Sequence, residues 1–113
     1  MKIHIITIFP ESFESYFSTS IIWNAIEKKL FEVEFHKLCD YSVRKTKRVD
    51  DKSFGMHGQI LSPEPLSLAI NDIFSKVWKK LKVIYLCPNW ELLTQEKSEQ
   101  YFETLQDDFI IIC

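Results

Sequence analysis

Residues 2–9, KIHIITIF, are the stretch that decides the fold class of this chain. Their β-branched and apolar density is typical of a buried strand, and Pro10 ends the strand because proline has no amide hydrogen to donate. In residues 11–29 the apolar positions recur every three or four residues, which predicts a helix with one apolar stripe. A buried strand followed directly by an amphipathic helix is the first unit of an α/β fold.

The same alternation of strand and helix continues along the rest of the chain. Further strands are predicted at residues 30–41, 83–87 and 109–113, the first of them with a more exposed face. Further helices are predicted at residues 63–82, which have proline for the first turn, and at residues 93–106, with Thr94 as N-cap. This order predicts a parallel sheet with helices on both faces, whose ligand sites lie beyond the carboxyl ends of the strands.

The size and hydrophobicity of the chain limit what it can be. With 113 residues, of which 46% are hydrophobic, it can fold as one domain or as part of one. No apolar run reaches the roughly eighteen residues that cross a bilayer, and the first residues do not resemble a signal peptide. We therefore expect no membrane association and a cytoplasmic location.

The charge is unevenly distributed. The formal net charge of the chain is -2, but residues 36–52 hold six lysines and arginines against three aspartates. Such a basic patch can hold phosphate groups, whereas a short run of lysines is also common in a solvated loop. Charge alone favours the solvated loop and leaves the phosphate-binding interpretation open.

A crowded loop overlaps the end of this basic segment. Residues 48–65 hold both glycines of the chain, Gly55 and Gly58, shortly after the adjacent Asp50 and Asp51. The aspartates can act on a proton, a metal or an arginine, or they can cap turns and face water. The GxxG spacing is too general to identify a phosphate loop, and turn glycines explain it better.

Several common kinds of site are not predicted. The glycines of a dinucleotide-binding loop do not follow the first strand, and no Walker A sequence occurs. His4, His36 and His57 fall in the first strand, the second strand and the crowded loop, so no metal cluster is expected from them. The three cysteines have no zinc-binding spacing either. We therefore predict no metal site and assign no catalytic residue.

Several motifs occur in an order that resembles a known family. They are MKIHIITIFPESFESYFSTSIIWNAIEKKL, DYSVRKTKRVDD, FGMHG, SPEPL, VIYLCP and FIIIC. This order resembles the amino-terminal part of the bacterial tRNA (guanine-N1)-methyltransferase family. The resemblance implies a SPOUT-type α/β domain with a deep trefoil knot and a homodimer. It also implies transfer of a methyl group from S-adenosylmethionine to the guanine beside the anticodon of tRNA.

The resemblance further implies which residues bind ligands. The positions that match the family's cofactor turn are Tyr85, Leu86, Cys87 and Pro88. The positions that match its substrate loop are Asp50, Asp51, Gly55 and Gly58. Contacts with the tRNA backbone, which weaken as salt rises, are expected from Arg44, Lys45, Lys47 and Arg48.

By this resemblance, residues 1–113 are the amino-terminal portion of one such domain. In the family, the knotted crossing, the aspartate proposed as base and the helical tRNA-binding domain would follow Cys113. The chain departs from the family in a loop with only two glycines and in Trp90, where the family commonly has glycine. Two hypotheses stand: the leading portion of the methyltransferase, or a non-catalytic module for binding or dimerisation. A flavodoxin-like binding protein is a weaker third, because no phosphate loop follows the first strand.

Overall fold

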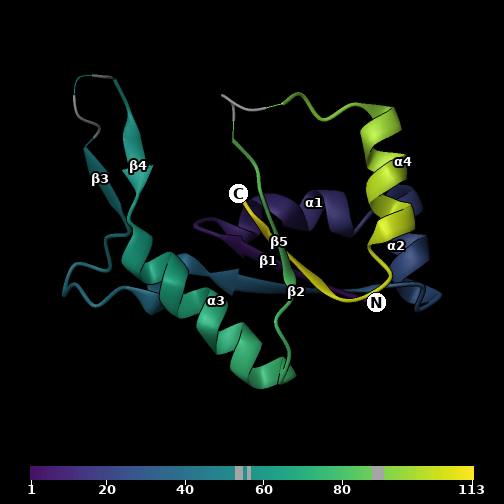
Figure 1. Ribbon diagram of the computed structural model, residues 1–113, viewed down its shortest axis with the longest axis horizontal. Coiled ribbons are helices and arrows are strands. Elements are labelled where there is room, and N and C mark those ends of the chain that lie inside the picture. Colours follow the sequence, from purple (N-terminus) through teal and green to yellow (C-terminus); the bar gives the residue numbers. More distant parts are fainter. Residues whose placement is uncertain (53–54, 56, 88–90) are drawn as a thin grey trace.

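A four-stranded parallel sheet is the framework of the molecule (Figure 1). The computed structural model describes residues 1–52, 55, 57–87 and 91–113. In spatial order the strands of the sheet are β2 (Glu32–Lys37), β1 (Lys2–Thr7), β6 (Phe109–Ile112) and β5 (Lys82–Tyr85). The predicted parallel sheet is confirmed, with the first strand at its centre.

Helices connect the strands and cover both faces of the sheet. Their bounds are η1 (Pro10–Phe13) and η2 (Leu38–Tyr41), both 3-10 helices, and α1 (Glu14–Phe17), α2 (Ser20–Glu27), α3 (Pro63–Val77) and α4 (Gln95–Thr104). The connections from β1 to β2 and from β5 to β6 run toward the β2 edge of the sheet. The connection from β2 to β5 runs toward the opposite edge. Right-handed crossovers therefore place α1, α2 and α4 on one face and α3 on the other, as Figure 1 shows.

The α3 face carries the main hydrophobic core. Ile73 of α3 is fully buried in a cluster that includes Ile6 of β1 and Ile110 of β6. Apolar side chains of α3 fill this face, and the others that pack there are Leu66, Ala69, Ile70, Phe74 and Val77. Pro63 occupies the first turn of α3, where its missing amide hydrogen removes no helical bond.

The opposite face holds an aromatic cluster. Phe35 of β2 lies 5.4 Å from Phe13 and 5.5 Å from Phe17, measured between ring centroids, and the pair with Phe17 is edge to face. These rings fix η1 and α1 against the sheet, since such aromatic pairs add about 0.5–1.5 kcal/mol to the burial of their area.

The predicted continuous helix over residues 11–29 is wrong. The structure divides this segment into η1, α1 and α2, with Thr19 in an extended conformation between the two α-helices. The Thr19 hydroxyl donates to the Ser15 carbonyl oxygen at 2.8 Å, a local bond that competes with helix continuation. As a result Ile21, predicted to lie in the apolar stripe, is 81% exposed.

Two further details differ from the sequence-based expectation. The strand predicted at residues 30–41 ends at Lys37, because Leu38 turns into the core through η2. The crowded loop contains a short antiparallel hairpin that the sequence pattern did not reveal, formed by β3 (Asp50–Lys52) and β4 (Gln59–Leu61). In the described part of the chain, no helix has the length and apolar character needed to span a membrane.

Candidate functional site

The β3–β4 hairpin carries the four residues predicted to form the substrate loop. Asp50 pairs with Leu61 and Asp51 with Ile60 in its antiparallel register. In the loop between the two strands, Gly55 and Gly58 have φ angles of +75° and +110°. Side chains are strained in that region of backbone space, so the two glycines of the chain stand where a turn needs them.

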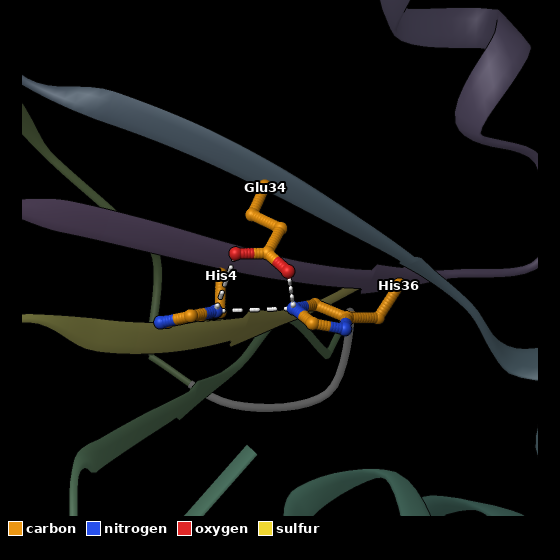
Figure 2. A group of neighbouring side chains, drawn as sticks. All are labelled: His4, Glu34 and His36. Atoms are coloured by element: carbon orange, nitrogen blue, oxygen red, sulfur yellow. Dashed lines mark hydrogen bonds and ion pairs between the residues drawn. The ribbon is translucent and has the colours of Figure 1, made fainter. Parts of the chain in front are cut away.

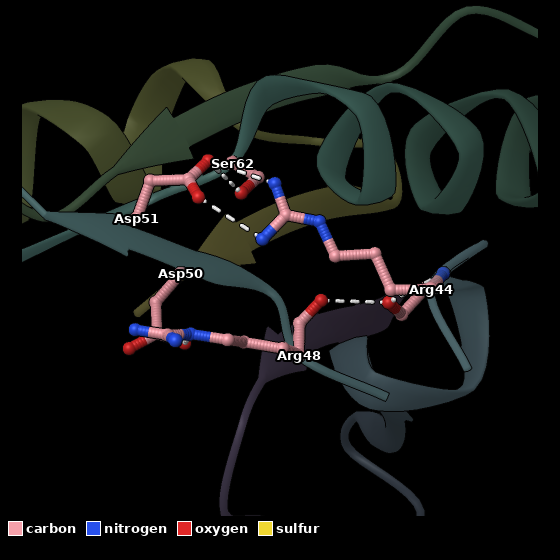
Figure 3. Close-up of polar contacts among 6 residues, drawn as sticks. Arg44, Arg48, Asp50, Asp51 and Ser62 are labelled. Carbon is pink, nitrogen blue, oxygen red and sulfur yellow. Dashed lines mark hydrogen bonds and ion pairs between the residues drawn. The ribbon is translucent and has the colours of Figure 1, made fainter. Parts of the chain in front are cut away.

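Arg44 holds the base of the hairpin through a two-pronged ion pair (Figure 3). Its two terminal nitrogens donate to the two carboxylate oxygens of Asp51 at 3.0 and 3.1 Å. The Ser62 hydroxyl, just before α3, donates to the same carboxylate at 2.8 Å. The Arg44 and Ser62 hydrogen bonds lower the pKa of Asp51, so this carboxylate is ionised at neutral pH.

Arg48 and Ser42 complete the network. The Arg48 side chain donates to Asp50 at 3.3 Å, and its main-chain carbonyl accepts the Ser42 hydroxyl at 2.7 Å. Between Arg48 and Asp50 lies buried Val49, whose carbonyl accepts the Ser62 amide at 2.7 Å. Both arginines predicted to contact tRNA are therefore engaged with the aspartates predicted to bind the substrate.

The two lysines predicted to contact tRNA are placed differently. Lys45 and Lys47 lie exposed on the turn that follows Arg44, and the Lys47 amide donates to the Arg44 carbonyl at 3.0 Å. Among the described residues, ion pairs are recorded for Arg44 and Arg48 but not for these lysines. Their charge is therefore still available to a ligand.

The predicted cofactor turn lies at the carboxyl end of β5. Tyr85 and Leu86 are exposed, and the Leu86 amide donates to the Ile112 carbonyl at 3.0 Å, which ties the turn to β6. Cys87 is half-buried, whereas Pro88 and Trp90 lie outside the described residues. Figure 1 shows the hairpin and the end of β5 as separate projections on the same side of the molecule.

Two surface hollows occur away from these predicted positions. One, of about 460 Å³, lies along α4 beside Ser98 and Phe102, and the other, of about 220 Å³, lies between residues 79–82 and 104–108. Neither is lined by a residue predicted to bind cofactor or substrate. The structure thus brings the hairpin residues together. A pocket shared by cofactor and substrate stays a prediction.

A second polar cluster was missed by the sequence analysis (Figure 2). His4 of β1 and His36 of β2 are only 3% and 6% exposed, and the Nδ1 of His4 lies 3.0 Å from the Nε2 of His36. The Glu34 carboxylate lies 4.0 Å from the first nitrogen and 3.9 Å from the second. His4 and His36, expected in two separate strands, are therefore brought into contact by the sheet.

The register of the sheet explains this cluster. His4 pairs with Glu34 and Ile6 with His36, so all four side chains point to the α3 face. The strand at residues 30–41 is expected to have a more exposed face, but α3 covers the side that carries His36, and burial lowers the pKa of both histidines. Knowledge of the parallel register would have predicted the contact, because the two strands are adjacent.

Known proteins resemble this chain both in sequence and in fold. A family model described as tRNA (Guanine-1)-methyltransferase TrmD matches residues 1–113. The chain belongs to this family. The resemblance inferred from its motifs is thereby confirmed, and so is the α/β fold class.

Individual members of the family show how much of them the chain represents. A tRNA (guanine-N(1)-)-methyltransferase of Oceanobacillus iheyensis is 39% identical over all of this chain and 46% of its own length. One from Bacillus cereus is 35% identical over the same shares. The crystal structure of tRNA (m1G37) methyltransferase from Aquifex aeolicus superposes with a TM-score of 0.80 at 27% identity, covering 100% of this chain and 50% of that one. The chain spans about half the length of these relatives.

Proposed function

We propose that this chain forms the amino-terminal portion of a single SPOUT-type methyltransferase domain. In this function, a methyl group moves from S-adenosylmethionine to N1 of the guanine beside the anticodon of tRNA. The observation that carries the proposal is the match of the family over residues 1–113, together with the superposition on the Aquifex aeolicus enzyme. A protein of this kind acts in the cytoplasm, where tRNA is modified.

The proposed sites follow the polarity of the sheet. Parallel sheets bind ligands beyond the carboxyl ends of their strands, and the cofactor turn of Tyr85, Leu86 and Cys87 stands at such an end. The exposed apolar side chains of this turn suit the adenine of the cofactor, with Pro88 next to them in sequence. S-adenosylmethionine supplies an electrophilic methyl group, and the protein has to align it with the attacking nitrogen.

The hairpin is proposed to hold the target guanine. Asp50 and Asp51 stand at its base and Gly55 and Gly58 in its loop, where backbone can approach a base closely. The ion pair with Arg44 fixes the orientation of Asp51, so that the loop is presented from a rigid base. Lys45 and Lys47 then contact the tRNA backbone. Arg44 and Arg48, which are paired with the aspartates, add to the positive electrostatic potential of this surface.

Homodimer formation is part of the proposal. Exposed large apolar side chains such as Trp23 of α2 and Leu86 after β5 leave surface that a second copy can cover. Light scattering tests this part by itself, because a monodisperse monomer at high concentration contradicts it.

A chimaera tests the methyltransferase function. This chain is joined, after Cys113, to the part of the Oceanobacillus iheyensis relative that it does not cover, and the product is incubated with labelled S-adenosylmethionine and tRNA. We expect label at guanine N1, identified by mass spectrometry of the digested tRNA. The added part alone is the control. A chimaera that folds but neither binds the cofactor nor methylates tRNA contradicts the proposal.

The same assay addresses the non-catalytic alternative. The loop between β3 and β4 contains only two glycines, which is the observation that favours a module for binding or dimerisation. If the chain is such a module, the chimaera should bind tRNA or form dimers without transferring a methyl group.

A further inference from the structure

The buried cluster of His4, Glu34 and His36 has the composition of a transition-metal site. Two imidazole nitrogens and a carboxylate oxygen lie within 4.8 Å of one another. Figure 2 shows the carboxylate above the gap between the two rings, with one oxygen toward each histidine. We propose that the Nδ1 of His4, the Nε2 of His36 and the Glu34 carboxylate bind one Zn²⁺ ion.

The distances suit a zinc ion after a small movement. Zinc bonds of about 2.0–2.1 Å in a tetrahedral site place neighbouring ligand atoms roughly 3.3 Å apart. The two ring nitrogens are 3.0 Å apart, so they need to separate only slightly. The Glu34 oxygens, at 3.9 and 4.0 Å from those nitrogens, need to approach, and the Glu34 side chain is 39% exposed and has an ion pair with Lys2.

The chemistry of the donors selects the kind of metal. Imidazole with carboxylate suits Zn²⁺, whereas Mg²⁺ and Ca²⁺ prefer oxygen ligands alone. With three protein ligands, water can take the fourth position from the side on which Glu34 is exposed.

Without a metal, the cluster satisfies its polar atoms poorly. The two rings make one hydrogen bond to each other, and the Nε2 of His4 is buried without a partner among the described residues. A metal replaces the hydrogen bond between the two rings with a stronger bond to each facing nitrogen, and the Nε2 of His4 then carries the proton of its ring.

The surrounding charges are balanced in pairs. Lys2 contacts the Oε2 of Glu34, and Lys76 of α3 pairs with Asp72 at 2.7 Å. The Oε1 of Glu34, which faces His36, is the oxygen that a metal can bind while Lys2 stays on Oε2. Lys2 nevertheless weakens the attraction for a cation, so its removal is expected to tighten binding.

The proposed site would connect two neighbouring strands beneath α3. His4 lies in β1, and Glu34 and His36 lie in the edge strand β2. An ion bound to the folded form alone stabilises it by mass action. The site is thus structural and stands apart from the hairpin and the cofactor turn, so its test is independent of methyl transfer.

A zinc titration tests the site. The 113-residue chain, stripped with a chelator, is titrated with Zn²⁺ against a colorimetric competitor, and thermal unfolding is followed with and without the ion. We expect one Zn²⁺ per chain and a raised melting temperature. His36→Gln, His4→Gln and Glu34→Gln are each expected to weaken binding at least about tenfold, because loss of even an outer partner of a metal ligand has that effect.

Matched variants separate this site from other zinc binding. His57→Gln removes an exposed histidine outside the cluster, and Glu32→Gln makes the same charge change as Glu34→Gln on the same strand. Both should bind as the wild type does, and so should Cys113→Ser, which removes the exposed thiol. Lys2→Gln should bind more tightly.

Co²⁺ gives a spectroscopic readout of the ligands. A tetrahedral site gives strong visible absorption, which Glu34→Gln should change in a chain that circular dichroism shows to be folded. Absence of stoichiometric binding by the wild type, binding unchanged in all three cluster variants, or binding abolished by Cys113→Ser each overturns the proposal.

Discussion

The histidine cluster and the hairpin network are both polar, but one is buried and the other is open to water. His4 and His36 are enclosed beneath α3, whereas Arg44 and Asp51 keep about half of their side-chain surface exposed, at 45% and 55%. In the buried cluster, loss of hydration determines the protonation of the side chains. In the hairpin, direct hydrogen bonds determine it, and solvent weakens their contribution to stability.

Helix α3 is connected by hydrogen bonds to the hairpin network and to η2. Ser62, immediately before its first residue, donates to Asp51, and Asp72 in its later turns accepts from the Tyr41 hydroxyl at 2.8 Å. Burial and the Asp72 contact raise the pKa of Tyr41 to about 12, so this hydroxyl remains a donor at neutral pH. Changes in the packing of α3 should therefore affect the hairpin network and η2.

The largest effect is expected from Ile73→Ala. This residue is fully buried in the core, and its truncation leaves a cavity beneath α3. We expect a loss of about 2–5 kcal/mol in the free energy of unfolding, measured by urea denaturation. Leu68→Ala, in the same helix but 42% exposed, is the control and should lose much less. Equal losses would contradict the assigned orientation of α3.

The second-largest effect is expected from acid, which should destabilise the buried cluster. Burial is the largest cause of the lowered pKa values of His4 and His36, which Glu34 partly opposes and Lys76 reinforces. Below the ordinary value of 6.5 the unfolded chain therefore binds more protons than the folded chain, and stability falls as pH falls. Each histidine contributes a slope of at most about 1.4 kcal/mol per pH unit.

Urea denaturation of the metal-free chain between pH 7.5 and 5 measures this slope, with those pH values chosen around the ordinary histidine pKa of about 6.5. His36→Gln should have a smaller slope, and His57→Gln should match the wild type. A slope that His36→Gln leaves unchanged would contradict the role assigned to burial.

Removal of the hairpin ion pair should cost less than either change. Arg44→Ala and Asp51→Asn take away contacts between exposed groups, so their urea midpoints should lie closer to the wild type than that of Ile73→Ala. The difference from the wild type should shrink as salt is added. Ser62→Ala, which leaves the Arg44 contact intact, is the comparison variant. A midpoint lower than that of Ile73→Ala would show that the network has a structural role greater than its exposure indicates.

The smallest effect on stability is expected from Lys45→Ala, which tests the surface rather than the fold. Under the proposed function it should weaken tRNA binding and reduce the slope of log affinity against log salt by about 0.7–0.9. Filter binding over a range of salt concentrations measures this slope. Lys28→Ala, at the end of α2, is the matched control. An unchanged slope would remove Lys45 from the proposed tRNA contact.

Much of the sheet and its helices could be predicted from the sequence, because strong local patterns determine them. The dense apolar runs became β1, β5 and β6, and Thr94 caps α4 as expected, with its hydroxyl accepting the Lys97 amide at 3.3 Å. The break at Thr19 was missed because hydrophobic periodicity continues across it, while the side-chain bond that interrupts the helix leaves no trace in that periodicity.

The candidate sites were less predictable, because contacts between distant segments create them. Arg44 and Asp51 lie seven positions apart, and their pairing requires the turn that begins at Arg44 to bring the two side chains together, whereas the sequence showed only a charged loop. His4 and His36 are separated by 32 positions, and their contact depends on the register between β1 and β2. The pattern of residues along one strand carries no information about that register, so the sequence placed the two histidines in separate strands without predicting their contact.

The central position of β1 has a consequence for synthesis on the ribosome. Residues 3–6 pair on one side with β2, which is made early, and on the other with residues 109–112, which are made much later. Until β6 emerges, the newly made chain therefore presents an apolar strand edge with free amide and carbonyl groups. Such edges recruit other chains, so a chaperone that shields this strand during translation should raise the yield of folded product.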